Sequence, residues 1–225
     1  MPEYSIVIPV LNEEESLEVL FSELKTQLDA LQASCEIIFI NDCSTDRSLP
    51  IMESLRQQYP ELVYIVTLPQ RSGQTYALRT GLKVARGAVV ITLDADLQND
   101  PADISKLIAR MREGYDVVCG WRRDRQDPPL KKVLSKLGNV LQRIFTGMKI
   151  HDVSCTLRAY KRECLADLKL QWEGQHRFIP LMLSKKKYKI GEIVSHHRTR
   201  RFGYSKYSHK RIFKVIADFF KVWLG

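Results

Sequence analysis

The feature that most constrains the fold is an alternation of short apolar runs with amphipathic stretches over the first 120 residues. The apolar runs are typical of strands buried on both faces, and they lie at 5–10, 36–40, 63–66, 88–93 and 116–120. Helices are expected between them, the first capped by Asn12 and the others at about 47–58, 74–86 and 102–113. Strands that alternate with helices form a mostly parallel sheet, so the sequence predicts an α/β fold.

Charge is distributed unevenly along the chain, whose formal net charge is +9. Residues 1–100 hold 15 acidic and 7 basic side chains, whereas residues 185–225 hold 12 basic and 2 acidic ones. A basic C-terminal segment indicates an anionic partner, which could be a nucleic acid, a phosphorylated ligand or anionic lipid. The alternative is a solvated charged face with no partner.

The chain carries neither the pattern of a secretion signal after Met1 nor a run of about 20 apolar residues that would span a membrane. Its five cysteines are odd in number and lack the spacing of metal ligands, so they are expected to be reduced. Together these features predict a cytoplasmic protein.

Polar side chains follow the ends of the predicted strands, where ligands bind in parallel sheets. Asn12 and Glu13 follow the first strand and could hold a nucleoside or cap a helix. Asp42 follows the second strand and could accept hydrogen bonds from a base or a ribose, or form an Asx-turn. Gly73 is expected to form a tight turn beside the site, and Arg122 follows the strand at 116–120.

Asp94, Ala95 and Asp96 form the strongest local motif, at the mouth of a buried strand. Two carboxylates one residue apart repel each other unless a cation neutralises them. Oxygen ligands favour Mg²⁺ or Mn²⁺, which bind one or two carboxylates together with the phosphates of a substrate. Such a metal would neutralise a departing diphosphate. The alternative is a turn in which an aspartate caps the helix at 102–113.

Basic side chains gather in the second half of the chain. Arginine matches phosphate oxygens with two hydrogen bonds, and lysine acts as a point charge. The set therefore indicates phosphate binding, although each residue alone is more often a surface residue. It comprises Arg122, Arg123, Arg125, Lys131, Lys132, Arg158, Arg177 and the run from His197 to Tyr207.

Taken in order, these motifs resemble those of glycosyltransferase family 2, and within it the dolichol-phosphate or polyprenyl-phosphate mannose and glucose synthases. The resemblance covers roughly residues 4–215. A late Ser-Lys-Tyr signature separates this branch from relatives that resemble cellulose and chitin synthases. The motifs are Pro9-Val10-Leu11-Asn12-Glu13-Glu14, Asn41-Asp42-x-Ser44-x-Asp46, Asp94-Ala95-Asp96-Leu97-Gln98-x-x-Pro101, Asp152 with Arg158, and Arg200-x-x-Gly203-x-Ser205-Lys206-Tyr207.

The resemblance implies a GT-A fold, which is a Rossmann-like fold of nucleotide-diphospho-sugar transferases. It implies that Asp94, Asp96 and Gln98 hold Mg²⁺ or Mn²⁺ and the diphosphate. Catalysis would rest on the two aspartates with Arg122, Arg200 and Lys206, which would meet donor or acceptor phosphates. Some members carry Tyr at the position of Leu11. The rest of the donor site would comprise Pro9, Leu11, Asn12, Glu13, Ile40, Asp42, Gly73 and Ala95, with Ser135 near the acceptor.

The implied reaction is the inverting, metal-dependent transfer of a hexose from a GDP- or UDP-sugar to a polyprenyl or dolichyl phosphate. A lipid monophosphate has a second pKa near 6, so it is a dianion at pH 7 and needs no strong general base. The protein would mainly align the reactants and stabilise the leaving group. A sugar hydroxyl acceptor, in polysaccharide or glycan assembly, would need a base, for which Glu173 and His176 are the candidates.

Two stretches could attach the protein to a membrane. Residues 208–225 carry an apolar helical stripe with lysines at its margins, typical of an in-plane helix on anionic lipid at the cytoplasmic membrane face. Residues 131–145 could do the same, and either helix could instead pack within the protein or between the subunits of a homo-oligomer. The predicted domains are a glycosyltransferase domain over 1–207 and this helix over 208–225. Nucleic acid is not expected as a partner, because the basic run lacks a recognised motif.

Overall fold

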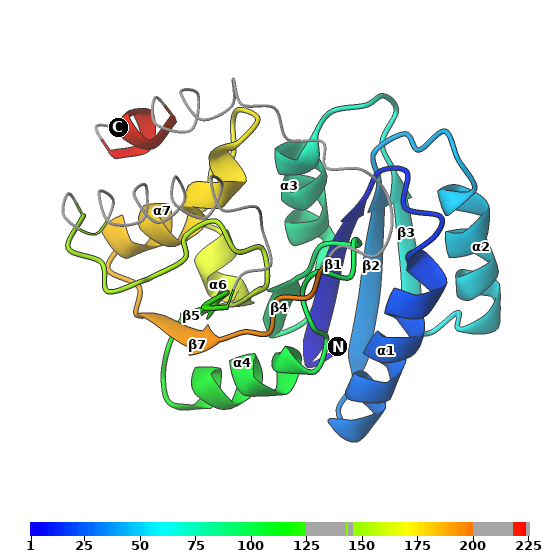
Figure 1. Ribbon diagram of the computed structural model, residues 1–225, viewed down its shortest axis with the longest axis horizontal. Coiled ribbons are helices and arrows are strands. Elements are labelled where there is room, and N and C mark those ends of the chain that lie inside the picture. The colour runs from blue at the N-terminus through cyan, green and yellow to red at the C-terminus, as the bar shows by residue number, and fades with distance from the viewer. Residues whose placement is uncertain (125–142, 144–145, 200–217, 224–225) are drawn as a thin grey trace.

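The computed structural model describes residues 1–124, 143, 146–199 and 218–223. The strands are β1 (Tyr4–Val10), β2 (Cys35–Asn41), β3 (Val63–Thr67), β4 (Val89–Thr92), β5 (Val117–Trp121), β6 (Arg158–Lys161) and β7 (Ile190–Val194). The helices are α1 (Leu17–Ala30), α2 (Ser48–Gln58), α3 (Gln74–Val84), α4 (Asp103–Arg112), α6 (Arg162–Leu165), the 3₁₀ helix η1 (Gln175–Phe178) and α7 (Ile179–Lys185). Strands and helices alternate as far as β5, which confirms the predicted α/β class (Figure 1).

The seven described strands form one sheet in the order β3-β2-β1-β4-β6-β5-β7. The first four of these run parallel to one another, and β7 runs parallel to β5. By contrast, β6 runs antiparallel to both of its neighbours, β4 and β5. The sheet is therefore mostly parallel, and the carboxyl ends of β2, β1 and β4 lie side by side at one edge.

Helices cover both faces of the sheet (Figure 1). Successive side chains of a strand point to opposite faces, so Ile6 and Ile8 of β1 pack in the cluster formed with α1, α2 and α4. Val7 packs in the second cluster, with α3, η1 and α7. Because both faces are covered, strands such as β1 and β2 consist of nearly continuous apolar runs rather than alternating ones.

The first helix begins later than the sequence predicted. Asn12 does not cap it, because α1 starts at Leu17 and Ser16 is its N-cap. Asn12 instead has a positive φ of 53°. Its side-chain oxygen accepts the Thr45 N–H at 2.8 Å. Asparagine tolerates this backbone conformation and favours such hydrogen bonds in turns, which explains the correction.

The second half contains elements that the apolar pattern did not predict, namely β6, α6, η1, α7 and β7. The helices predicted at 131–145 and 208–225 lie mostly outside the described residues and stay predictions. Residues 218–223 are helical, and Phe219 and Val222 are buried, with the Phe178 and Phe219 ring centroids 6.2 Å apart. Within the described residues, no helix has the length and apolar character to cross a membrane.

Candidate active site

Three loops at the carboxyl edge of the sheet each contain a residue with a positive φ angle. Asn12 follows β1, Cys43 follows β2 and Leu97 follows the end of β4, with φ angles of 53°, 56° and 60°. Residues other than glycine rarely adopt this conformation, and they keep it only where the surrounding structure holds them. Leu97 is buried in the core, which anchors the loop that carries Asp94 and Asp96.

Hydrogen bonds join the loops after β1 and β2. The Glu13 N–H donates to Ser48 Oγ at 2.8 Å, and the Glu14 N–H donates to Asp46 Oδ2 at 3.1 Å. In return, the Arg47 N–H donates to Glu14 Oε2 at 2.9 Å. The two sequence motifs that end at these positions therefore form one continuous wall of the candidate site.

Asp42 joins this wall to the start of α3. It is 3% exposed, and its N–H donates to the Val10 carbonyl at 2.9 Å. Its two carboxylate oxygens accept the N–H groups of Ser72 and Gly73 at 2.6 and 2.9 Å. Gly73 has a φ of 90°, and a side chain there would collide with the carboxylate of Glu173. The turn predicted at Gly73 is confirmed, because only glycine fits this position without strain.

Asp94 is held on both sides by side chains from distant segments. Gln74 Nε2 donates to Asp94 Oδ1 at 2.8 Å, and Thr156 Oγ1 donates to Asp94 Oδ2 at 2.5 Å. Each carboxylate oxygen has two lone pairs, so these bonds orient Asp94 without using up its capacity to bind a ligand. The Gln98 N–H donates to Asp96 Oδ1 at 3.1 Å, which places the third expected ligand residue beside the second.

The electrostatics of this pair fit a divalent cation. Burial and the neighbouring charge of Asp96 raise the pKa of Asp94 to about 6, although the Thr156 hydrogen bond and the charges of Arg122 and Arg158 oppose the rise. A cation relieves such a conflict between carboxylates. In the part of the chain that is described, no group of three or more His, Cys, Asp and Glu side chains converges. Two carboxylates are a ligand set that fits Mg²⁺ or Mn²⁺, which take further ligands from water and phosphates.

Arg122, which follows β5, is held by a buried carboxylate. Its Nε and Nη2 donate to the two oxygens of Asp152 at 2.7 and 3.0 Å, and Nη2 also donates to Ser154 Oγ at 2.9 Å. The Asp152 side chain is 3% exposed and that of Arg122 is 13% exposed. A bidentate pair of this kind fixes the plane of the guanidinium group, so Arg122 has one defined orientation.

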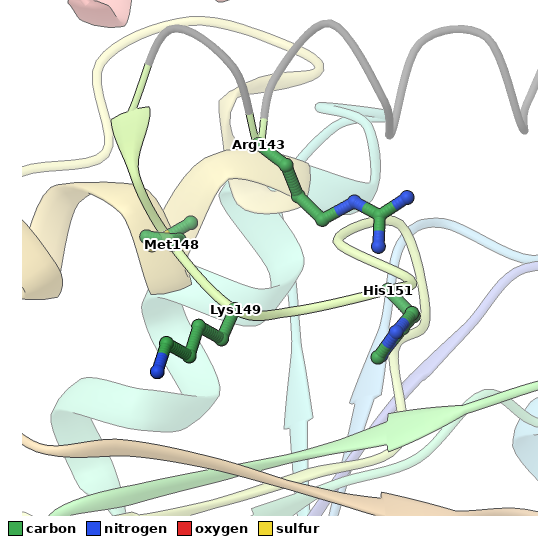
Figure 2. A pocket seen from close by; sticks show the side chains of 4 residues that line it. All are labelled: Arg143, Met148, Lys149 and His151. Carbon is green, nitrogen blue, oxygen red and sulfur yellow. The ribbon is translucent and has the colours of Figure 1, made fainter.

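A cavity of about 470 Å³ is lined by Arg143, Met148, Lys149 and His151. The last of these residues directly precedes Asp152 in the sequence. Figure 2 shows Arg143 extending to the side on which His151 lies, whereas Lys149 points away from it. The His151 ring stacks on Trp121 with centroids 4.2 Å apart. Arg143 and Lys149 give the lining two basic side chains.

The start of the basic C-terminal run lies against the aspartate loop. The Arg198 N–H donates to the Gln98 carbonyl at 2.8 Å. The Arg198 guanidinium forms ion pairs with Glu23 and Asp100 at 2.7 and 2.9 Å. These contacts place the last described residues before Arg200 at the candidate site.

Most of the residues predicted for the site lie at this edge of the sheet. Ile40 lies in β2, where its side chain is fully buried and packs on Gly81 of α3, so only its backbone is placed to meet a ligand. Ser135, Arg200 and Lys206 lie outside the described residues. Those at the end of β1, on the strand-end loops and at the start of α3 are Pro9, Leu11, Asn12, Glu13, Asp42, Gly73, Asp94, Ala95, Asp96, Gln98 and Arg122.

Gln74 and Thr156 are site residues that the sequence did not reveal. Gln74 directly follows the glycine of a predicted turn, and this was the one feature of the sequence that could have indicated a place in the site. Thr156 carries no signal, because its position depends on the pairing of β6 with β4, which aligns Thr92 with Arg158. The Thr92 hydroxyl donates to the Thr156 carbonyl at 2.6 Å, and this holds Thr156 beside Asp94.

The order of the described strands, the one antiparallel strand among them, β6, and the carboxylate pair in the loop after β4 define the class of protein. This is the GT-A fold of nucleotide-diphospho-sugar transferases. A sequence model described as glycosyl transferase family 2 matches residues 5–169, and the chain belongs to this family.

Relatives with known names are similar over nearly the whole chain. The undecaprenyl-phosphate 4-deoxy-4-formamido-L-arabinose transferases of Salmonella choleraesuis and Salmonella typhimurium are each 38% identical over 214 residues. These matches cover 95% of this chain but only 65% of each relative, so the chain spans less than two thirds of their length.

A solved structure confirms the fold. Glucosyl-3-phosphoglycerate synthase from Mycobacterium tuberculosis, in complex with Mn²⁺, uridine diphosphate and phosphoglyceric acid, matches with a TM-score of 0.74. The match covers 99% of this chain and 78% of that protein. The sequence identity is 20%, so the likeness concerns the arrangement of the backbone.

Proposed function

We propose that the protein transfers a hexose, with inversion, from a GDP- or UDP-sugar to a polyprenyl or dolichyl phosphate in a metal-dependent reaction. The observation that carries this proposal is the pair Asp94 and Asp96, with Asp94 oriented by Gln74 and Thr156. Membership of family 2 and relatives named for undecaprenyl phosphate support the acceptor. A solved neighbour in complex with Mn²⁺ and uridine-diphosphate-glucose supports the metal and the donor class.

Each part of the site has a role in this proposal. Asp94, Asp96 and Gln98 hold Mg²⁺ or Mn²⁺, which supplies positive charge to the departing diphosphate. Arg122, oriented by Asp152, binds phosphate oxygens. The nucleoside lies against the wall formed by Pro9, Leu11, Asn12, Glu13, Asp42, Gly73 and Ala95. Ser135, Arg200 and Lys206, outside the described residues, complete the phosphate contacts.

The contacts of the two candidate bases support a phosphate acceptor over a sugar hydroxyl. His176 is 2% exposed, and its Nδ1 lies 2.6 Å from Thr75 Oγ1. Glu173 Oε2 accepts the Thr75 N–H at 2.9 Å. Both side chains thus help to hold the start of α3. A phosphate monoester is largely a dianion at pH 7, so it attacks without a base.

A lipid-linked acceptor requires the protein to work at a membrane surface, which we propose is the cytoplasmic face. The domain over 1–207 carries the chemistry, and residues 208–225 contact anionic lipid. In the described part of that segment, Phe220 and Lys221 are exposed next to each other. An apolar side chain beside a cationic one is typical of helices that lie in the membrane interface.

The proposal is tested by measuring the transfer of label from radiolabelled GDP- and UDP-sugars to a short polyprenyl phosphate. The assay is run in detergent, with and without Mn²⁺. The panel includes nucleotide-linked 4-deoxy-4-formamido-L-arabinose, because the relatives are named for that sugar. A labelled lipid product that disappears with EDTA is expected. Metal-dependent hydrolysis of the donor without a lipid product would contradict the acceptor, and turnover of no donor would contradict the whole proposal.

Asp96→Asn is expected to reduce the transfer rate about 100-fold or more while the protein stays folded. The side chain lies in the loop after β4 and not in the core, and the oxygen of asparagine can still accept the Gln98 N–H. Transfer rate and the thermal unfolding midpoint measure the two effects. Asp29→Asn on α1 is the matched control, because it removes the same charge from a side chain that is 61% exposed and remote from the site. Full activity, or loss of cooperative unfolding, in Asp96→Asn would refute the assignment.

A further inference from the structure

Arg158 is a buried cation to which the proposed reaction gives no role. It is the first residue of β6 and is 2% exposed. Among the described residues, no carboxylate forms an ion pair with it, and its buried Nε has no hydrogen-bond partner. A buried charge without a carboxylate partner destabilises a fold, so its presence calls for a compensating role.

The guanidinium group donates hydrogen bonds to the backbone of two separate segments. Nη2 donates to the Val153 carbonyl at 2.5 Å, in the segment that precedes β6. Nη1 donates to the His176 carbonyl at 2.8 Å, and Nη2 also donates to the Arg177 carbonyl at 3.2 Å, both in η1. One side chain therefore ties together two segments that are not adjacent in the sequence.

The segment before β6 supports the candidate site from one side. Asp152, next to Val153, holds the guanidinium group of Arg122. Thr156 donates its hydroxyl hydrogen to Asp94. A shift of this segment would therefore change the orientation of both the expected phosphate-binding arginine and the expected metal ligand.

The segment that contains η1 supports the site from the other side, through α3. His176 Nδ1 lies 2.6 Å from Thr75 Oγ1, and the same hydroxyl oxygen accepts the Gly174 N–H at 2.8 Å. Thr75 directly follows Gln74, which donates to Asp94 at 2.8 Å. A shift of η1 would therefore move the first turn of α3 and, with it, the second hydrogen bond to Asp94.

We propose that Arg158 is a positioning residue that orients the Asp94 carboxylate toward the metal and diphosphate by holding both segments at once. The inference rests on the proposed function, because it takes Asp94 as a metal ligand. Arginine presents a planar fork of N–H donors that reaches three carbonyls, whereas lysine has a single nitrogen. Residues that orient a metal ligand change metal affinity by about 10–100-fold when they are replaced.

Arg158→Lys tests this role, because the charge stays while the fork of donors is lost. Mn²⁺ binding in the presence of UDP or GDP is measured by electron paramagnetic resonance, together with kcat, the KM for the donor and the unfolding midpoint. We expect Mn²⁺ affinity to fall about 10-fold or more and kcat to fall with it, in a protein that unfolds cooperatively. Arg158→Gln, which keeps a planar donor, and Gln74→Ala, which removes a donor to Asp94, are expected to show the same loss.

Arg86→Met is the matched control. Arg86 Nε and Nη2 donate to the buried carboxylate of Glu36 at 2.9 and 2.7 Å, at the opposite edge of the sheet. This variant is expected to unfold at a lower temperature with unchanged Mn²⁺ affinity. Unchanged Mn²⁺ affinity and kcat in Arg158→Lys would overturn the inference, as would an equal loss of affinity in Arg86→Met. Absence of Mn²⁺ binding by the unaltered protein with either nucleotide would instead overturn the proposed function.

Discussion

Asp94 is a carboxylate whose ionised form is opposed by its surroundings. Burial and the charge of Asp96 raise its pKa, while Gln74 and Thr156 hold its two oxygens in place. A group of this kind destabilises the metal-free protein when it is ionised, and a bound cation makes the ionised form favourable. At the scale of the residue, the requirement for ligand binding and the requirement for stability therefore conflict.

Asp94→Asn is expected to stabilise the metal-free protein at neutral pH although it abolishes transfer. The pKa of Asp94 is about 6 in the folded protein against an ordinary value of 3.8, so the folded state binds the proton more tightly. Stability conferred by this group therefore falls as the pH rises between these values. Asparagine does not ionise, so the advantage of the variant grows between about pH 4 and 6 and is then constant, at about 3 kcal/mol.

Thermal unfolding of both proteins in EDTA between about pH 4 and 8 measures this effect. Asp29→Asn serves again as a control, because exposed ion pairs contribute little to stability and no comparable pH trend is expected. The prediction would be contradicted if the unfolding midpoint of Asp94→Asn lay below that of the unaltered protein at every pH.

At the scale of the element, the first turn of α3 is held by two carboxylates from different segments. Asp42 accepts the N–H groups of Ser72 and Gly73, and Glu173 accepts that of Thr75. The first N–H groups of a helix lack partners within it, and the helix dipole favours negative charge there. The turn thus joins the loop that carries Asp42 to Gln74, whose side chain donates to Asp94.

Glu173→Gln is expected to leave transfer within about threefold of the original rate, because the amide oxygen can still accept the Thr75 N–H. A general base at this position would lose about 10²–10⁴-fold in rate on the same change. Initial rates of lipid glycosylation across the pH range distinguish these outcomes. The variant therefore separates a phosphate acceptor from a sugar hydroxyl.

Glu173→Ala is the companion variant, since it removes the acceptor of the Thr75 N–H altogether. It is expected to lower the free energy of unfolding by about 1 kcal/mol, as the loss of a helix cap does. Denaturant unfolding measures this. Equal stability of the alanine and glutamine variants would show that the contact with α3 does not support the fold.

At the scale of the whole molecule, the site lies where two parts of the sheet meet. The parallel part, β3-β2-β1-β4, supplies the wall proposed to hold the nucleoside and the two aspartates. The part beyond β4 supplies Thr156, Arg122 with Asp152, and Arg198. Ligand binding at this junction therefore connects both parts of the fold.

Mn²⁺ together with the correct nucleoside diphosphate is expected to raise the thermal unfolding midpoint, and EDTA to reverse it. A ligand present at about 100 times its dissociation constant stabilises the folded state by about 2.7 kcal/mol. Differential scanning calorimetry with UDP and with GDP measures the effect, and the larger shift identifies the nucleotide. Asp96→Asn is expected to show no shift, and a midpoint insensitive to both nucleotides in Mn²⁺ would contradict the site.

Local patterns in the sequence were sufficient for the α/β class, the strands β1 to β5, the helices α2 to α4 and the carboxylate motif at Asp94 and Asp96. The reason is that burial on both faces, helical periodicity and turn chemistry are recorded within a few consecutive residues. The same patterns misplaced the start of α1 at Asn12, because they do not show how a loop is packed.

Only the tertiary structure decided which side chains orient Asp94, the aspartate expected to bind the metal. The antiparallel insertion of β6 brings Thr156 to Asp94, and the packing of η1 on α3 sets the position of Gln74. Arg158 reaches both segments from a single buried position. These contacts join residues that are far apart in the chain, and a hydrogen bond between such residues leaves no periodic trace in the sequence around either partner.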